Sequence, residues 1–423
     1  MIKHRGIKNN DRNTSYYKSQ IEKAKKPKKE NFFDYSRRRQ MNSYIRAVAV
    51  VSAFMLVTTG FIMLGIFLRS LTAEEYEQSF AVAAEQQHEG AALYIIPGEE
   101  PPAEPCGVAE IFYNFRGAYL DVRQLECLDG LQAFIDMIQA RDINAVVIDI
   151  KKPDGVIPFR VNGHFTAIVG EHNKIDLRIQ DILEMLRAHG IYVSGRIACF
   201  RDGLASAGYL MHGALIESAT GMRFADAGGS YWLNIYSRYA RNHVLHLIQE
   251  SVLLGFDEIV LSYFYLPGAP GLAYDDGGVS RSSAVSGFVA EARELVRGLS
   301  PHGRLGLSFP VNNLMNMPNE AMGLEPGELA GVSDFFVTNF APSHLPPGTL
   351  GISDPESEPY TTVRALAERL GDISGQTMLR PYIQAFDGAG GVAYGDVQIS
   401  AQRQALWESG ITVWTLVNYD NEY

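Results

Sequence analysis

The sequence predicts an α/β protein, a (β/α)₈ or TIM barrel preceded by one transmembrane helix and a stalk. Three observations carry this prediction. Eight short apolar runs alternate with amphipathic segments from residue 115 onward. One uncharged run, 47–68, lies near the start of the chain. Between them, 69–110 contains a Pro-Gly-Glu-Glu-Pro-Pro stretch that interrupts regular structure. The chain therefore divides into a tail at 1–46, a membrane helix, a stalk and a barrel domain at 111–423.

The basic tail sets the predicted orientation in a membrane. The 22 apolar residues of 47–68 are enough for a helix to cross about 30 Å of hydrocarbon. A cleaved signal peptide has a shorter apolar core and a shorter region before it. Residues 1–46 hold fourteen Lys or Arg and four acids, so the positive-inside rule places them in the cytoplasm. We expect a single-pass cell-membrane protein with an extracytoplasmic barrel; a buried helix or an unusual signal sequence is the alternative.

Charge and cysteine usage limit the classes of ligand. Residues 69–423 hold 23 basic and 44 acidic residues, a net charge of about −21 that disfavours DNA, RNA and anionic surfaces. The basic tail fits attraction to anionic lipid heads, and no folded nucleic-acid module accompanies it. Cys106, Cys127 and Cys199 show no metal-ligand spacing. We therefore predict no nucleic acid, no metal and no cofactor.

The eight runs are apolar through the middle, which is typical of strands buried on both faces of a parallel sheet. They lie at 115–121, 144–151, 192–200, 258–266, 304–311, 334–341, 378–386 and 413–419. The predicted helices lie at 127–140, 175–189, 236–254, 284–299, 326–330, 360–370 and 400–409. Eight strand–helix units over about 300 residues fit a barrel with right-handed crossovers.

Two points stay open at this level. An open doubly wound sheet is the alternative to a barrel, although no G-x-G-x-x-G follows the first predicted strand. No helix is predicted after the eighth strand. Either the segment before residue 115 closes the barrel there, or the chain is incomplete.

Six motifs, in order on the predicted strands, resemble those of a known bacterial family. They are NAVVIDIK at 144–151 with Asp154-Gly155, HGIYV at 189–193 with Arg196-Ile197, GFDEI at 255–259, PSH at 342–344, RPYIQ at 380–384 and WTLVN at 414–418. Over residues 115–423 the chain is similar to the bacterial "putative glycosyl hydrolase" domain. The resemblance implies a (β/α)₈ fold and hydrolysis of O-glycosyl bonds in a polysaccharide, but a fold does not fix a function.

The strand ends depart from the family's pattern. Barrel chemistry sits at the C-terminal ends of the strands, and glycoside hydrolysis normally needs two carboxylates there. Where the family carries acids, this sequence has Ser262, Phe309 and Ala385, and Tyr265 stands in the place of an arginine. The catalytic carboxylates are therefore incomplete by this comparison.

Acids remain at other strand ends, and three of them are the catalytic candidates: Asp149, paired with Asp154 or Asp202. Asp149 and Lys151 are expected on one strand face because side chains alternate with period two. A neighbouring lysine keeps an aspartate ionised, which suits a nucleophile or an acceptor of sugar hydroxyls. A structural ion pair at the barrel rim explains the same two residues equally well.

A further set of residues is predicted to contact a sugar. Arg380 and Gln384 share a strand face, as do Trp414 and Asn418, and an aromatic ring beside amide and guanidinium donors suits a sugar. For Trp414 the alternative is barrel packing. For His344 it is a loop histidine bonded to backbone. The full set is Lys151, Arg196, Tyr263, Tyr265, His344, Arg380, Gln384, Trp414 and Asn418.

Three functions follow from these observations. The first is a membrane-anchored barrel that binds an extracytoplasmic polysaccharide and has lost its chemistry. The second is an active glycoside hydrolase or lyase that uses a rearranged set centred on Asp149. The third is a non-catalytic envelope scaffold that recognises a protein partner.

Overall fold

A computed structural model describes residues 108–423 of the protein, except residues 126, 160–176, 209, 376 and 389. The predicted tail at 1–46, the predicted membrane helix at 47–68 and the stalk up to residue 107 lie outside the described residues. Within the described part of the chain, no helix is both long and apolar enough to cross a membrane.

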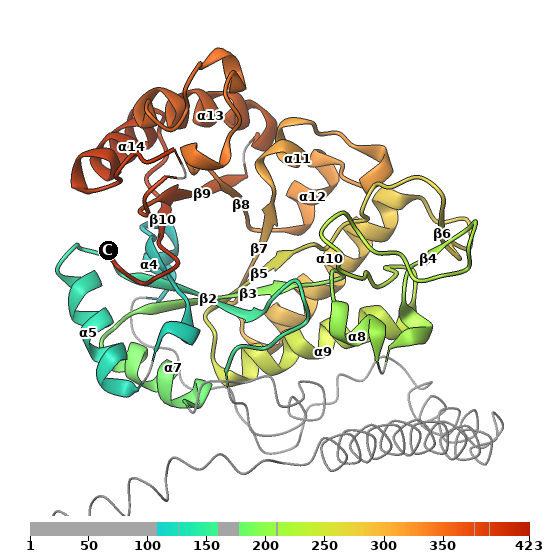
Figure 1. The fold of residues 1–423 in the computed structure, drawn as a ribbon. Helices are drawn as coiled ribbons and strands as arrows, with labels where there is room; N and C mark the ends of the chain where they lie inside the picture. Colours follow the sequence, from blue (N-terminus) through green and yellow to red (C-terminus); the bar gives the residue numbers. More distant parts are fainter. Residues whose placement is uncertain (1–107, 126, 160–176, 209, 376, 389) are drawn as a thin grey trace, which may run out of the picture. The chain divides into compact units, whose positions relative to one another are not determined.

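Eight parallel strands close into a barrel, which confirms the predicted architecture (Figure 1). Around the barrel the order is β1-β10-β9-β8-β7-β5-β3-β2. Each observed strand falls within the apolar run that predicted it, because a strand covered by helices outside and packed inside needs apolar residues on both faces. The strands are β1 Arg116–Leu120, β2 Ala145–Lys151, β3 Tyr192–Ala198, β5 Glu258–Ser262, β7 Arg304–Phe309, β8 Phe335–Asn339, β9 Met378–Gln384 and β10 Trp414–Val417.

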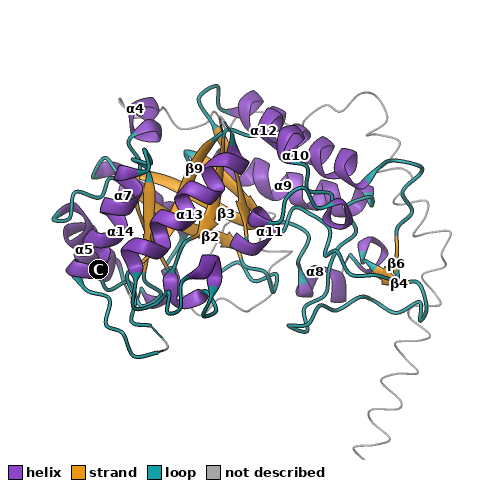
Figure 2. Cartoon of the chain, turned by 90° about the horizontal axis from the view of Figure 1, so that it is seen from above, coloured by secondary structure: helices purple, strands orange, loops and turns teal. Residues whose placement is uncertain are grey.

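Helices surround the strands (Figure 2). Their ends follow local sequence signals: Ser237 caps α9 by accepting a hydrogen bond from the Ala240 amide, and Gly255, at φ 99°, ends it. The helices are α4 Val108–Tyr113, α5 Leu128–Gln139, α7 Ile179–Ala188, α8 Gly203–Ala207, α9 Arg238–Leu254, α10 Arg281–Leu299, α11 Val311–Met315, α12 Pro326–Val332, α13 Pro359–Ser374 and α14 Asp396–Glu408. Short 3-10 turns lie at Val122–Gln124, Met211–Gly213, Glu320–Met322, Pro342–His344 and Thr349–Gly351.

A small extension was not predicted from the sequence. It carries the two-stranded antiparallel sheet of β4 (Ile216–Glu217) and β6 (Leu272–Ala273), from the loops after β3 and β5. Both views place this sheet beyond α8, at the edge of the barrel domain (Figures 1 and 2). Its strands of two residues are too short to give a readable alternation of side chains.

The interior of the barrel is a packed core of its own, separate from the larger shell between strands and helices. Inward-pointing side chains fill it, as the period-two alternation of strand residues requires. They are Phe112, Phe115, Tyr119, Ala145, Val147, Tyr192, Val260, Phe335, Val337, Tyr382, Val413 and Val417. Because this core is filled, a ligand has no room within it, and a cavity lies above it at the C-terminal ends of the strands.

The barrel closes without a helix after its last strand. Residues Arg116, Gly117 and Ala118 of β1 pair directly with Trp414, Thr415 and Leu416 of β10. At the opposite, N-terminal end of the barrel, the Phe112 ring of α4 lies against Phe335, with 5.6 Å between ring centroids. The described part of the segment before residue 115, α4, therefore covers one end of the barrel and does not complete its wall.

Candidate functional site

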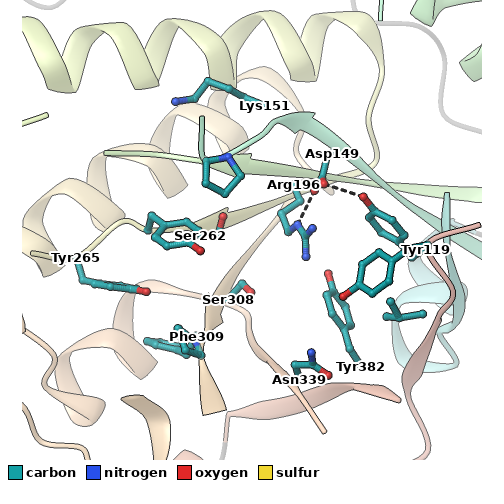
Figure 3. A pocket seen from close by; sticks show the side chains of 15 residues that line it. Tyr119, Asp149, Lys151, Arg196, Ser262, Tyr265, Ser308, Phe309, Asn339 and Tyr382 are labelled. Atoms are coloured by element: carbon teal, nitrogen blue, oxygen red, sulfur yellow. Dashed lines mark hydrogen bonds and ion pairs between the residues drawn. The ribbon is translucent and has the colours of Figure 1, made fainter. Parts of the chain in front are cut away.

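A cavity of about 230 Å³ opens at the C-terminal ends of the strands (Figure 3). Seven of the eight strands contribute polar side chains to it, at or above the top of the packed interior. Its walls carry Tyr119, Asp149, Lys151, Pro153, Arg196, Ser262, Tyr263, Tyr265, Ser308, Phe309, Pro310, Asn339, Tyr382, Val417 and Tyr419. Of the predicted site residues, the cavity therefore brings together Asp149, Lys151, Arg196, Tyr263 and Tyr265.

Asp149 is held from two sides. Its Oδ1 accepts a hydrogen bond from Arg196 Nε at 2.6 Å, and its Oδ2 accepts one from the Tyr119 hydroxyl at 2.8 Å. These partners stand on β2, β3 and β1, which lie side by side in the barrel, so the register of adjacent strands fixes the cluster. Both carboxylate oxygens are thus engaged by protein donors, with Lys152 Nζ at 4.0 Å as a further cation.

A bulge separates Asp149 from Lys151. Asp149 pairs with Arg196, but Lys151 pairs with the next residue, Ile197, so the register shifts between them. The extra residue breaks the period-two alternation. The prediction that the two side chains share a strand face is therefore wrong. Lys151 borders the cavity, but its ammonium group points away from Asp149 (Figure 3). It donates to Asp202 Oδ2 at 2.6 Å and to the Cys199 carbonyl at 3.2 Å.

The other two catalytic candidates do not line the cavity. Asp202 is buried, caps α8 through the Ala205 amide, and lies 3.4 Å from His243 Nε2. Asp154 is an exposed turn residue whose Oδ1 accepts a hydrogen bond from the Val156 amide. Among the residues that line the cavity, Asp149 is the one acid.

Tyrosines dominate the lining. Tyr263 adopts a left-handed backbone conformation, with φ 51°, which is uncommon for a bulky residue and turns the chain sharply at the end of β5. Its ring lies 5.8 Å from that of Trp232, which also packs 6.3 Å from Tyr265. The buried Trp232 comes from the extension, so the extension supports this wall of the cavity from behind.

The phenols of Tyr119, Tyr265 and Tyr382 are hydrogen-bond donors at ordinary pH. Burial first, and the nearby Asp149 carboxylate second, raise the pKa of Tyr119 above its usual value, against the lowering effect of Arg196. Burial also raises the pKa of Tyr382 and of Tyr265. These side chains therefore stay protonated and do not serve as anionic nucleophiles.

Arg380 and Gln384 lie elsewhere in β9. The Arg380 guanidinium is buried toward the N-terminal end of the barrel, where it pairs with Glu258 and stacks 3.7 Å from the Phe115 ring centroid. Gln384 is buried as well: its Oε1 accepts from the Ser343 amide, and its Nε2 donates to the Phe386 carbonyl. Neither residue lines the cavity.

Trp414, Asn418 and His344 also lie outside the cavity lining. Trp414 is buried in the shell between strands and helices, with the Arg403 guanidinium 4.8 Å from its ring. Asn418 is buried and donates to the Ala385 carbonyl at 2.6 Å. His344 Nδ1 lies 2.9 Å from Asn339 Nδ2, and burial lowers its pKa. The residues of this segment that reach the cavity are Val417, at the end of β10, and Tyr419, two residues beyond it. They alternate along the chain with Trp414 and Asn418, which were selected from the sequence.

Several lining residues escaped the sequence analysis, among them Tyr119, Ser308, Asn339, Tyr382 and Tyr419. Tyr382 lies midway between Arg380 and Gln384 on the same strand face, so the period-two rule that selected those two also pointed to it. For the others the available signal was their place near a strand end. Within the described residues, no group of three His, Cys, Asp or Glu side chains is placed to hold a metal ion.

The number of carboxylates in the cavity limits the reactions that the cavity can catalyse. Hydrolysis by the usual route needs one carboxylic acid to protonate the leaving oxygen and a second carboxylate about 5–9.5 Å away. The cavity offers Asp149 alone, already bonded to Arg196 and Tyr119. What the walls do offer is a ring of hydroxyls, an amide, a guanidinium and aromatic faces, which together match the surface of a sugar.

One solved structure that is similar to this chain agrees with the fold. The PgaB (BpsB) glycoside hydrolase domain from Bordetella bronchiseptica superposes with a TM-score of 0.54 at 15% identity, over 73% of this chain and 94% of that one. A hypothetical protein from Ruminiclostridium thermocellum is 25% identical over 45% of this chain and 96% of that one, with a TM-score of 0.40. No curated protein matches the chain in sequence. The sequence family described as "Putative glycosyl hydrolase domain" matches residues 117–423, and the chain belongs to that family.

Proposed function

We propose that this protein is a membrane-anchored, glycoside-hydrolase-like barrel that binds an extracytoplasmic polysaccharide at the mouth of the barrel without cleaving it. One observation carries the proposal: the tyrosine-rich cavity contains a single acid, and both oxygens of that acid accept hydrogen bonds from the protein. A site of this kind keeps the groups that hold a sugar. It lacks the second carboxylate that two-acid hydrolysis requires.

The rearranged catalytic sets find no support in the geometry. Asp202 is occupied by Lys151 and by the cap of α8, and Asp154 faces solvent outside the cavity. An envelope scaffold that recognises a protein remains the alternative, and it needs no glycan at the mouth of the barrel.

Binding and cleavage are tested together on the full-length protein in detergent, with a panel of bacterial envelope polysaccharides. We expect one or more of them to raise the melting temperature by mass action while no reducing ends appear. Release of reducing ends would refute the non-catalytic part of the proposal. A panel without any thermal shift would refute glycan binding and favour the scaffold.

The variant Tyr419→Ala tests whether the glycan binds at this cavity. Its ring is 44% exposed at the mouth, so its truncation changes the site more than the stability of the fold. We expect about tenfold weaker binding, since an aromatic face buried by a sugar contributes on the order of 1 kcal/mol. The matched control is Tyr239→Ala on α9, 46% exposed and outside the cavity lining, which should leave the affinity unchanged.

Anchoring rests on the sequence, in which the uncharged run 47–68 follows a tail with fourteen basic residues. We expect the protein in the membrane fraction of cells and released from it when 47–68 is deleted. Protease added to intact cells with a permeabilised outer layer should digest the barrel and spare the tail. Digestion of the tail with protection of the barrel would reverse the proposed orientation.

A further inference from the structure

We propose that the cavity recognises an acidic sugar, with the carboxylate of a uronic acid seated on the outer edge of the Arg196 guanidinium. The proposal rests on the proposed function, because it names the class of glycan that the same cavity binds. It starts from the one guanidinium that lines the cavity.

Arg196 uses only part of its hydrogen-bonding capacity within the protein. Its Nε donates to Asp149 Oδ1, and its Nη1 and Nη2 donate to no other described residue. Arginine carries five N–H donors in a rigid fork, so four of them remain for a ligand. Figure 3 shows the outer edge of this fork pointing into the space bordered by Ser262, Ser308, Asn339 and Tyr382.

The position of the fork is fixed before a ligand arrives. Asp149 holds it from behind, and the rings of Tyr119 and Tyr382 lie beside it, with centroids 5.5 and 5.7 Å from the Arg196 Cζ. A guanidinium fixed in this way loses little conformational entropy on binding a planar carboxylate with two parallel hydrogen bonds.

A second group near the guanidinium lacks a partner. The Tyr382 hydroxyl is buried and makes no hydrogen bond with any described residue. It points toward the Arg196 guanidinium (Figure 3). A buried hydroxyl without a partner is costly, and burial keeps this phenol protonated, so it is a donor available to an anion. A neutral sugar hydroxyl would satisfy the Tyr382 group but would leave the cationic fork without a charged partner.

The charge around the cavity favours an isolated carboxylate. Asp149 is the one acid in the lining. It pairs with Arg196 at Nε, so its carboxylate lies on the opposite side of the guanidinium from the open edge. Residues 69–423, which include the barrel, carry a net charge of about −21, and this charge opposes a dense polyanion. That opposition is screened beyond about 8 Å at physiological salt, whereas the contact at Arg196 is local. A glycan with carboxylates spaced by neutral sugars therefore fits better than a continuous polyuronide.

The test uses the full-length protein and matched probes. The probes are heparosan and hyaluronan tetrasaccharides, in which glucuronic acid alternates with a neutral amino sugar. Each is also prepared with its carboxyl groups reduced to primary alcohols, and calorimetry or thermal shift measures affinity. We expect at least one acidic form to bind about tenfold or more tightly than its reduced counterpart, the difference typical of a charge-assisted bidentate contact.

Two variants assign that preference to residues. Arg196→Met should bring the affinities of the acidic and reduced forms to within about twofold of one another. Tyr382→Phe removes a hydroxyl that has no hydrogen-bond partner among the described residues, so it should weaken binding of the acidic form while leaving the melting temperature unchanged. The control is Arg293→Met on α10, outside the cavity lining. The Arg293 side chain is 23% exposed and pairs with Asp334, and the Arg196 side chain is 25% exposed and pairs with Asp149. The control variant should keep the full preference.

The outcomes separate this inference from the proposed function. A preference for the reduced forms, equal binding of both forms, or a preference that persists in Arg196→Met would overturn the inference and leave glycan binding standing. The same holds if neutral envelope polysaccharides bind and the acidic tetrasaccharides do not. If no glycan of either kind binds, the proposed function fails together with the inference.

Discussion

Replacing Arg380 by methionine is expected to lower the free energy of unfolding by about 3–5 kcal/mol, the usual cost of breaking a fully buried ion pair. The Arg380 guanidinium and the Glu258 carboxylate pair inside the barrel, and both side chains are almost entirely buried. Without Arg380, the Glu258 carboxylate keeps, among the described side chains, the Tyr192 hydroxyl at 3.2 Å as its hydrogen-bond donor. Chemical denaturation followed by circular dichroism measures the change.

A double variant separates the loss of the partner from the value of the pair. In Arg380→Met/Glu258→Met no uncompensated charge is left inside the barrel, so we expect stability within about 1–2 kcal/mol of the native protein. A double variant as unstable as the sum of the two single variants would contradict this account. Arg364→Met, which breaks a surface pair with Glu408, serves as the control and should cost less than about 1 kcal/mol.

Asp202→Asn is expected to cost about 3–5 kcal/mol at neutral pH and to remove part of the acid sensitivity of the fold. Burial alone would raise the pKa of Asp202, but the Lys151 ammonium and the His243 ring outweigh burial and lower it below its usual value. The substitution leaves the Lys151 ammonium, itself buried, without its anionic partner. Asp202 also holds the start of α8 through the Ala205 amide.

The sign of the pH dependence follows from that lowered pKa. Asp202 binds a proton less readily in the folded state than in the unfolded chain, whose aspartates titrate near pH 3.9. Its contribution to stability is therefore complete above about pH 4 and is lost as the pH falls toward the lower folded-state pKa. In Asp202→Asn this part of the acid-induced loss should disappear. His243, whose pKa is lowered mainly by burial, makes a separate contribution that weakens the fold as the pH falls below about 6.5.

Unfolding curves of the two proteins from pH 7 to pH 2 provide the measurement. Parallel profiles, with the same slope below pH 4, would show that Asp202 does not carry the acid sensitivity assigned to it. Asp181→Asn, which breaks a more exposed helix-surface pair with Arg178, should change stability by less than about 1 kcal/mol and leave the profile intact.

The barrel could be read from the sequence because its signal is repeated. Eight apolar runs, each long enough for one strand and each followed by a helical pattern or by the chain end, admit few topologies. The small sheet of β4 and β6 gave no such signal, and neither did the role of α4 in covering the N-terminal end of the barrel.

For the candidate site, the sequence placed the chemistry at the strand ends and named Asp149, Arg196, Tyr263 and Tyr265, which the cavity brings together. It could not decide how deep each inward residue lies. Arg380 and Tyr382 share a strand face, yet one pairs with Glu258 in the barrel interior and the other lines the cavity. Depth depends on the tilt and stagger of the strands around the closed barrel, which period-two alternation does not encode.

The sequence by itself determined the fold class, the family and the scarcity of acids at the strand ends, because these depend on residue types in order along the chain. Only the tertiary structure decided which polar groups meet. The bulge after Asp149 turned Lys151 toward Asp202, and strand register placed Arg196 and Tyr119 on the two oxygens of Asp149. Bulge and register arise from pairing between segments far apart in the chain, so no local pattern of residues specifies them.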